Sequence, residues 1–246
     1  MPKELDTGKA FEIAPGIYWV GFADPGAGFH CNPYILNDGD ETVFFDPGSV
    51  PHFPIVLGKV MQVADLKNIR HIVAHHQDPD LCSAIPRFEE LVSGVGGELR
   101  ICTHTRASVL INHYGTRSDF YRVDANDWKL TLRSGRTLRF IFTPFLHFPG
   151  AFMTYDERSK ILFSSDIFGG LSFDWNLYAN DHYAEAMKAF HENYMPSNHI
   201  LRHAMNKLDG LDISMIAPQH GSIIKKEDVR RYIDILKNLE CGEDLF

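Results

Sequence analysis

The sequence predicts an α/β (α+β) protein in which two sheets pack together and helices cover their outer faces. Short apolar runs rich in β-branched and aromatic residues occur in two batches along the chain. Each batch is followed by segments with helical periodicity, which favours two sheets with helices outside. The chain has 246 residues and is 44% hydrophobic, so it can bury a substantial core as a single domain, 1–246.

The expected elements follow from apolar periodicity and from the Gly, Asp and Asn turn signals that separate the runs. The expected strands cover 17–22, 33–37, 42–48, 71–74, 98–104, 128–132, 137–144, 161–166 and 213–218. The expected helices cover 53–63, 85–93, 107–115, 182–195, 197–211 and 227–240.

The composition excludes several classes of partner. The formal net charge is −8 and the chain has no block of basic residues, which argues against nucleic acid and against an anionic membrane surface. No apolar stretch has the length of a membrane helix, and the N-terminus has no secretory signal. The four cysteines are scattered, without a CxxC pair, as expected of reduced thiols in a cytoplasmic protein.

Metal-type side chains stand where four apolar runs end. The runs are HIVAHHQDPD (71–80), FIFTPFLHF (140–148), ILFSSD (161–166) and SMIAPQHG (214–221). Six ligands are too many for one tetrahedral ion and suit two ions that share a bridging carboxylate. The sequence therefore predicts a two-metal centre. Its candidate ligands are His76, Asp78, Asp80, His147, Asp166 and His220.

Each candidate, taken alone, also has an ordinary structural interpretation. The first loop could be a solvated turn, because Asp and Pro are favoured turn residues. His147 could be a core or surface histidine, Asp166 could cap a following segment, and His220 could be a turn residue before Gly221. It is the recurrence of all four strand contexts in one order that favours a metal site.

Those four contexts resemble the metallo-β-lactamase superfamily and, within it, the diiron domain of the flavodiiron proteins. That family carries His-x-Glu-x-Asp-His after a strand, then TPxLHxP, ILFSxDxFG and IAPxHG. This chain reads HHQDPDL, TPFLHFPG, ILFSSDIFG and IAPQHG at the corresponding places. The similarity extends from the FFDPG strand end to the last helix, and it implies an αββα sandwich of two packed sheets with outer helices.

The resemblance also implies how the ligands are shared. It assigns His76, Asp78 and His147 to one metal, and Asp80 and His220 to the other, with Asp166 bridging. It further implies two iron ions with a bridging oxide or hydroxide. Three imidazoles and three carboxylates without a required thiolate favour iron or manganese on their own chemistry, although zinc remains possible. Asp46, in FFDPG, resembles an aspartate that orients a ligand or loop, or it belongs to an Asp-Pro-Gly turn.

Two positions depart from the family pattern. Asp78 replaces the usual Glu and is one methylene shorter. Leu81 replaces a further His and cannot coordinate, so one metal is left with an open position. Cys82 could substitute, although a small buried thiol is also a common core residue. His75 could substitute too, but alternation along the loop should point it away from His76.

An open metal position suits a small uncharged ligand such as O2 or NO. Aromatic residues near the four loops could form an apolar pocket for it or could simply fill the core. These residues are Phe29, Phe148, Phe152, Phe168, Phe173 and Trp175. His30, Tyr183 and Tyr194 could donate a hydrogen bond to the bound molecule.

Three functions are compatible with this site. The first is an oxygen sensor that acts on a signalling partner, as in the oxygen-binding diiron proteins of bacterial chemotaxis that this chain resembles. The second is an O2 or NO reductase supplied by an external electron donor, since the chain shows no flavodoxin-like domain and no flavin site. The third is a dinuclear metallohydrolase, which the Asp78 and Leu81 departures disfavour. The resemblance also implies a homodimer.

Overall fold

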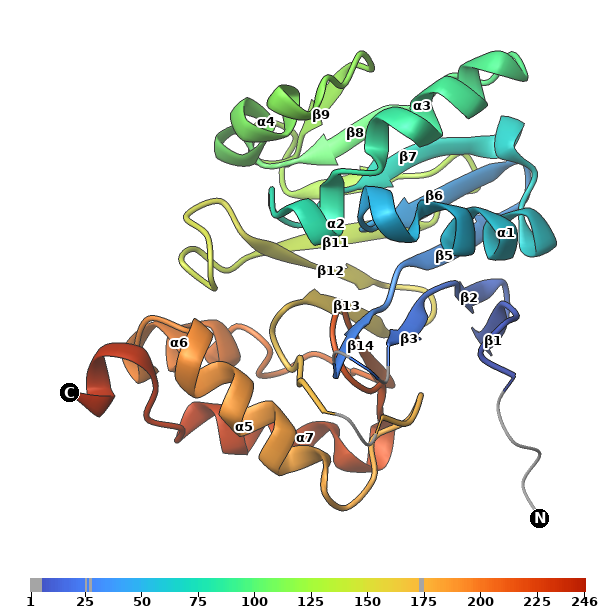
Figure 1. Cartoon of the computed structure of the whole chain (residues 1–246). Helices are drawn as coiled ribbons and strands as arrows, with labels where there is room; N and C mark the ends of the chain where they lie inside the picture. The colour runs from blue at the N-terminus through green and yellow to red at the C-terminus, as the bar shows by residue number, and fades with distance from the viewer. Residues whose placement is uncertain (1–5, 25, 27, 173–174) are drawn as a thin grey trace.

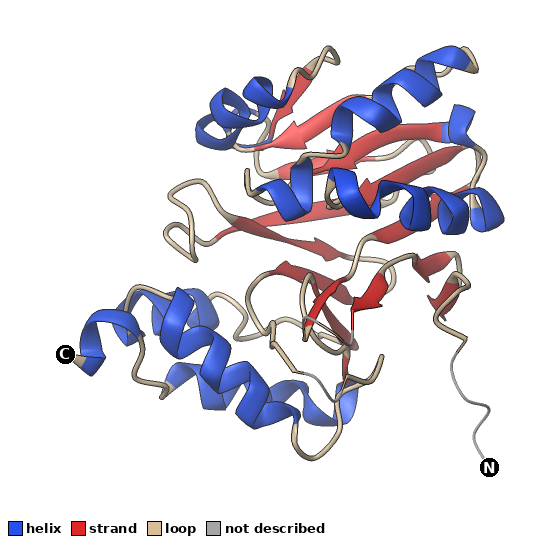
Figure 2. Ribbon diagram, in the orientation of Figure 1, coloured by secondary structure: helices blue, strands red, loops and turns tan. Residues whose placement is uncertain are grey.

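Two large β-sheets form the centre of the protein, and helices cover the outer face of each (Figures 1 and 2). The computed structural model describes residues 6–24, 26, 28–172 and 175–246, without the side chains of Asp24 and Phe29. The arrangement is the αββα sandwich that the sequence predicts. Its two sheets meet face to face, so strand ends from both halves of the chain can approach one another.

The first sheet is built from the N-terminal half of the chain. Its seven strands follow the order β1 (Phe11–Ala14), β2 (Ile17–Trp19), β5 (Tyr34–Asp38), β6 (Glu41–Phe45), β7 (Ile69–Val73), β8 (Arg100–Thr103) and β9 (Phe120–Arg122). The strands from β6 to β9 are parallel. The helices of this half are α1 (Phe53–Val63), α2 (Pro79–Cys82), α3 (Ile85–Gly94) and α4 (Thr105–Ile111).

The second sheet is built from the C-terminal half. Its six strands are β10 (Lys129–Thr131), β11 (Thr137–Phe142), β12 (Phe152–Asp156), β13 (Ile161–Ser165), β14 (Met215–Pro218) and β15 (Ile224–Lys225). Strands β13 and β14 are parallel, and the other pairs are antiparallel. Helices α5 (Tyr183–Tyr194), α6 (Asn198–Asn206) and α7 (Lys226–Lys237) cover it (Figure 1).

Shorter elements complete the fold. Strands β3 (Phe22–Asp24) and β4 (Phe29–Cys31) form a separate antiparallel pair. Single turns of 3-10 helix occupy η1 (Val50–His52), η2 (Leu66–Asn68), η3 (Asn112–Tyr114), η4 (Val123–Ala125) and η5 (Gly242–Leu245). Among the described residues, none of the helices combines the length and the apolar character that crossing a bilayer requires.

The core has three layers, and strand alternation sorts the side chains among them. Between the sheets, the rings of Phe45 and Phe163 stack with their centroids 4.0 Å apart. The next residue back along β13, Leu162, faces the opposite way and packs among the buried residues of α5, α6 and α7. Phe44, beside Phe45 on β6, likewise packs under α1 and α3.

The structure differs from the sequence prediction at several elements. The expected strand 17–22 is two strands, because the chain leaves β2 after Trp19 and pairs β3 with β4. Strand β12 was not predicted, because the polar residues Thr154 and Asp156 interrupt its apolar pattern although both are buried. The buried guanidinium of Arg136 pairs with Asp156 and explains how the sheet accommodates that carboxylate.

Candidate metal centre

The six candidate ligands lie together where the two sheets meet. His76, Asp78 and Asp80 follow β7 of the first sheet, while three other residues follow β11, β13 and β14 of the second. These three are His147, Asp166 and His220. Asp80 stands within the one-turn helix α2, which was expected to be loop and which begins with Pro79 at its first position.

Four of the six residues form one tight group. The ligand atoms of His76, Asp78, His147 and Asp166 all lie within 4.8 Å of one another. Oδ2 of Asp166 is 3.3 Å from Nε2 of His76 and 3.0 Å from Nε2 of His147. Oδ2 of Asp78 is 3.4 Å and 3.2 Å from the same two nitrogens. Two imidazoles thus alternate with two carboxylates around a common point.

A second group lies on the other side of Asp166. Nε2 of His220 is 3.1 Å from Oδ2 of Asp80 and 3.5 Å from Oδ1 of Asp166. Asp166 therefore presents one carboxylate oxygen to each group, which is the geometry that a shared carboxylate requires. Cys31, a residue that was not predicted as a ligand, joins Asp80 and His220 as a third closely placed side chain.

Hydrogen bonds orient the two more buried imidazoles among the three candidate ligands. Nδ1 of His220 lies 3.0 Å from the carbonyl oxygen of His30, to which it donates. Nδ1 of His76 lies 3.1 Å from the Ser165 hydroxyl. Because Nδ1 is engaged in both rings, Nε2 is the nitrogen that each ring presents to the carboxylates, as is usual for histidines that bind metal ions.

The electrostatic field of the cluster favours positive charge. Burial disfavours protonation of His76, but the Asp166 and Asp78 carboxylates outweigh burial and hold its pKa well above the usual range. Hydrogen bonds to Asp166 and Asp78 raise the pKa of His147 to about 9. Burial alone would raise the pKa of Asp166, yet the facing imidazoles hold it well below its usual value. Either protons on the imidazoles or bound metal cations can neutralise the negative charge of these carboxylates.

Two buried polar atoms support the metal alternative. Nε2 of His76 and Oδ1 of Asp166 have no hydrogen-bond partner, although both are shielded from solvent. Buried polar atoms are normally satisfied, since leaving one unpaired costs roughly 1–3 kcal/mol. Both atoms point into the cluster, where a cation would satisfy them. The donor set, three imidazoles and three carboxylates, therefore fits a pair of divalent cations.

Four of the seven described non-glycine residues with positive φ lie within two positions of a candidate ligand in the sequence or contact its loop. Asp46, Phe145, Ser165 and Phe168 have φ angles of 44°, 66°, 55° and 67°. Such left-handed conformations are uncommon for residues other than glycine, and they cluster at functional sites. Ser165 immediately precedes Asp166, and Phe168 follows two residues later. The tight backbone path thus directs the Asp166 carboxylate toward the histidines.

Leu81 replaces a histidine ligand of the family, and neither residue considered as a substitute, His75 or Cys82, faces the cluster. His75 points away from His76, as alternation predicted, and its Nδ1 lies 2.6 Å from Oδ2 of Asp46. Asp46 also accepts the backbone N–H of His75, so it holds the start of the ligand loop as the sequence suggested. The thiol of Cys82 donates to the carbonyl oxygen of His76, 2.9 Å away, and is therefore a core group.

The aromatic residues serve mainly as core. Phe152 lies between the sheets and Phe168 packs against the C-terminal helices, while Phe148 and Trp175 are partly buried beside the core. Phe173 and the side chain of Phe29 lie outside the described residues.

Three residues were considered as hydrogen-bond donors to a bound molecule. Two of them, Tyr183 and His30, bond to backbone carbonyls, and the third, Tyr194, lies near the cluster. The Tyr183 hydroxyl donates to the carbonyl oxygen of Phe168, and Nε2 of His30 lies 2.8 Å from the carbonyl oxygen of Ser172. Tyr194, 52% exposed, lies at the edge of the cluster with its ring centroid 6.2 Å from that of His147.

Residues that the sequence did not single out complete the site. Ser165 contacts His76, and nothing distinguishes it from the other serines before the fold is known. His191 of α5 accepts the backbone N–H of Phe168 through Nε2, and its Nδ1 lies 2.8 Å from the Met187 carbonyl oxygen. A histidine among the apolar positions of an amphipathic helix was the available signal for this residue.

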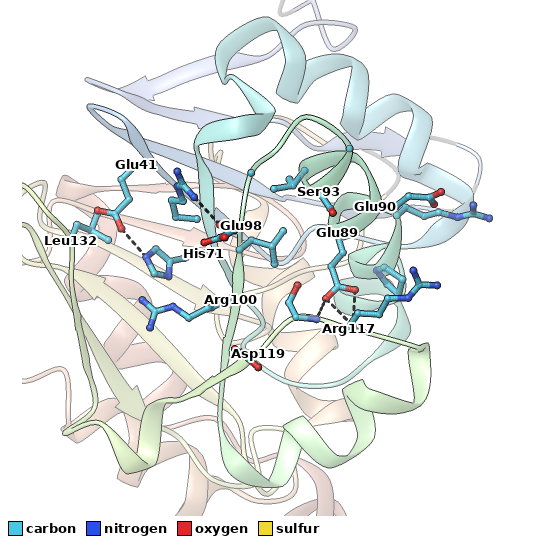
Figure 3. A pocket seen from close by; sticks show the side chains of 18 of the residues that line it. Glu41, His71, Glu89, Glu90, Ser93, Glu98, Arg100, Arg117, Asp119 and Leu132 are labelled. Carbon is cyan, nitrogen blue, oxygen red and sulfur yellow. Dashed lines mark hydrogen bonds and ion pairs between the residues drawn. The ribbon is translucent and has the colours of Figure 1, made fainter.

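A large hollow of about 1250 Å³ opens at the other end of β7 (Figure 3). There Glu41 and His71 face each other, with Oε1 and Nε2 2.9 Å apart, and Glu89 accepts backbone N–H groups of Arg117 and Ser118. Among the described residues, both groups of closely spaced metal-type ligands lie away from this hollow. The histidine–aspartate cluster is therefore the candidate site.

Gly221 gives a direct test of how tightly the His220 loop is packed. Its φ is +77°, and a Cβ there would lie 2.5 Å from the Tyr183 hydroxyl and 2.8 Å from the backbone of Gly170. We expect Gly221→Ala to lower the free energy of unfolding by roughly 1–3 kcal/mol, measured by urea titration. Gly210→Ala is the matched control, because Gly210 has φ +83° and open space around it. Equal losses in the two variants would contradict the packing argument.

A sequence model described as ODP family beta lactamase matches residues 29–221, a range that includes all six candidate ligands. The chain belongs to this family.

Solved structures agree with the assignment to the ODP family. The chemotaxis sensor ODP, in a structure described as its peroxy diiron species, is 30% identical to this chain with a TM-score of 0.79. The match covers 96% of this chain and 97% of the sensor. The apo state of the chemotaxis sensor ODP from T. denticola matches with a TM-score of 0.76. The flavodiiron protein from Giardia intestinalis, 23% identical with a TM-score of 0.84, shares the fold over 97% of this chain and 60% of its own.

Curated sequences give the same picture for this ODP family member. The nitric oxide reductase of Moorella thermoacetica is 27% identical over 237 residues, which cover 89% of this chain and 58% of that protein. The flavo-diiron protein FprA2 of Clostridium acetobutylicum is 24% identical over 255 residues, covering 94% and 62%. This chain thus spans about three fifths of the length of these relatives.

Proposed function

We propose that this protein is a non-haem diiron protein that binds O2 and reports it to a signalling partner. His76, Asp78 and His147 would hold one iron, Asp80 and His220 the other, and Asp166 would bridge them. The observation that carries the proposal is the pair of ligand groups that share Asp166. When bound, the two iron ions supply the redox-active centre to which a diatomic molecule can attach.

The cluster has a closed side and an open side. The side chains of His76, Asp166 and His220 are at most 4% exposed, whereas those of Asp78, Asp80 and His147 are 26% exposed. A small ligand therefore approaches past the second set. Tyr194 is exposed beside His147, and Phe145, two positions before His147 in the sequence, is exposed as well. Their apolar surface suits an uncharged diatomic better than an anionic substrate.

The sensor function is supported by the likeness to the chemotaxis sensor ODP, which extends over nearly the whole of both chains. A signalling protein is the partner that such a role requires, and the proposal includes the homodimer that the family resemblance implies. All four cysteines are free and buried, which supports a reducing compartment such as the cytoplasm.

Reduction of O2 or NO is the second candidate, because relatives over most of this chain are nitric oxide reductases. That function needs an electron donor. A dinuclear hydrolase is the third candidate and is disfavoured, because the loop carries Asp78 and Leu81 where the hydrolases of this fold carry histidines.

One experiment separates the three functions. Protein purified without added metal is first assayed for metal content by mass spectrometry, and we expect about two irons per chain. Ferrous protein is then prepared anaerobically and exposed to O2 while its near-ultraviolet and visible spectrum is followed. A spectral change that persists without a donor supports sensing. Rapid bleaching with donor-dependent O2 consumption would establish a reductase. Two zinc ions and no response to O2 would leave hydrolysis.

A further inference from the structure

The two ligand groups that share Asp166 contain different numbers of other candidate ligands. The first has His76, Asp78 and His147 in addition to the shared carboxylate, whereas the second has only Asp80 and His220. Helix α2 offers nothing more to the second group, because Leu81 is fully buried in the outer core beneath the helices of the first sheet. Any further protein ligand would have to come from another part of the chain.

Cys31 lies beside the poorly supplied group. Its Sγ, a carboxylate oxygen of Asp80 and a ring nitrogen of His220 all lie within 4.8 Å of one another. Sγ is also 3.9 Å from Nδ1 of His220, the nitrogen that faces the His30 carbonyl, so the thiol lies beside the imidazole ring. Cys82, which is adjacent to the ligand loop in sequence, instead gives its thiol hydrogen to the His76 carbonyl. Of these two thiols, Cys31 is the one in a position to reach the second group.

The backbone fixes Cys31 in this place. Cys31 ends strand β4 and forms an antiparallel bridge with His220, so the two residues are held side by side. The next residue, Asn32, donates its backbone N–H to the Gln219 carbonyl and its side-chain amide to the carbonyls of Pro218 and Gly221. The thiol is 1% exposed, so it is directed into the protein and not toward solvent.

The charge balance of a loaded site leaves room for one more anionic ligand. Three carboxylates leave two divalent ions one negative charge short of neutrality, and either a bridging hydroxide or one thiolate would supply that charge. Oδ1 of Asp166, which faces His220 at 3.5 Å, is buried without a hydrogen-bond partner. This unpartnered oxygen indicates independently that the space between Asp80, His220 and Asp166 is built for a cation.

We infer that Cys31 is a further metal ligand, binding through Sγ the ion held by Asp80 and His220. On binding, the thiol releases its proton to solvent and coordinates as the thiolate. The inference rests on the proposed two-metal function and specifies its second position as Asp80, His220, Cys31 and the shared Asp166. A soft sulfur ligand would distinguish this position from the first, which has only nitrogen and oxygen donors.

Cobalt(II) is the probe that tests this assignment. The metal-free full chain is loaded anaerobically with two equivalents of cobalt(II), and its near-ultraviolet spectrum is recorded. A cobalt–thiolate bond produces a sulfur-to-metal charge-transfer band that nitrogen and oxygen ligands do not give. We expect the band in the wild-type protein and its complete loss in Cys31→Ala and Cys31→Ser. Cys82→Ala is the matched control and should keep the band.

Each outcome decides the inference. Two bound cobalt ions without a charge-transfer band would overturn the role of Cys31 and leave the two-metal function intact. A band that survives in Cys31→Ser but disappears in Cys82→Ala would assign the sulfur ligand to Cys82 and also reject the inference. Failure of the wild-type chain to bind a second cobalt would instead contradict the proposed function. Circular dichroism of both Cys31 variants establishes that they are folded, and Cys31→Ser preserves the side-chain volume if alanine does not.

Discussion

Protein carrying Asp166→Asn is expected to lose metal from both positions at once. The substitution keeps the shape of the side chain but removes the charge that the two ligand groups share, since Oδ2 faces His76 and His147 while Oδ1 faces His220. Outer contacts of a metal site already change affinity by roughly 10- to 100-fold, and a direct ligand should change it by at least as much. Metal content by mass spectrometry should fall from about two ions per chain to nearly none.

Glu41→Gln is the matched control for this prediction. Glu41 is also a buried carboxylate that faces a histidine, but it lines the hollow at the other end of β7 (Figure 3). The control should retain both metal ions. Loss of one ion only in Asp166→Asn would show that Asp166 belongs to a single position, and unchanged metal content would reject it as a ligand.

The second large effect is a loss of stability at mildly acid pH that depends on His191. This ring is fully buried, and burial lowers its pKa from 6.5 to about 4. Below pH 6.5 the unfolded chain therefore binds a proton that the folded protein does not. The contribution of neutral His191 to the free energy of unfolding is complete above pH 6.5 and is lost as pH falls toward 4. The total loss amounts to about 3 kcal/mol.

Comparison of the wild-type protein with His191→Gln isolates this contribution. Glutamine can still accept the backbone N–H of Phe168 but does not titrate, so it lacks the acid-dependent loss. Stability is measured as the free energy of unfolding of the metal-free proteins in urea. As pH falls from 7 to 5, this free energy should decrease by about 2 kcal/mol more for the wild type than for His191→Gln. His199→Gln, at a solvent-exposed position, serves as the control. If the two free energies of unfolding differed by the same amount at pH 7 and pH 5, His191 would take up a proton in the folded protein as readily as in the unfolded chain.

Central strands such as β6 and β13 could be predicted from the sequence because they are buried on both faces and therefore read as continuous apolar runs. Strand β12 could not, since the pairing of Asp156 with Arg136 is a long-range contact that no local pattern reveals. The break after Trp19 has a similar origin, because only the pairing of Phe22 with Cys31 shows where the chain leaves the large sheet.

The candidate ligands were found because each stands where a strand ends, and such ends meet at one edge of a layered fold. The structure places all six together, and it adds groups that carry no local signature. Cys31 is separated from His220 by 189 positions and lies in a three-residue strand, so only the folded chain reveals their proximity. Ser165 became relevant only through its contact with His76.

The candidate ligands come from both halves of the sandwich. His76, Asp78 and Asp80 follow a strand of the first sheet, whereas His147, Asp166 and His220 follow strands of the second. A bound ion would therefore act as a crosslink that joins the two halves of the molecule. At a free metal concentration of one hundred times the dissociation constant, binding would add about 2.7 kcal/mol to the free energy of unfolding. Any reaction that lengthens or releases a bond at the ion would loosen that crosslink, so the chemical state of the centre could be felt by surfaces on both halves at once.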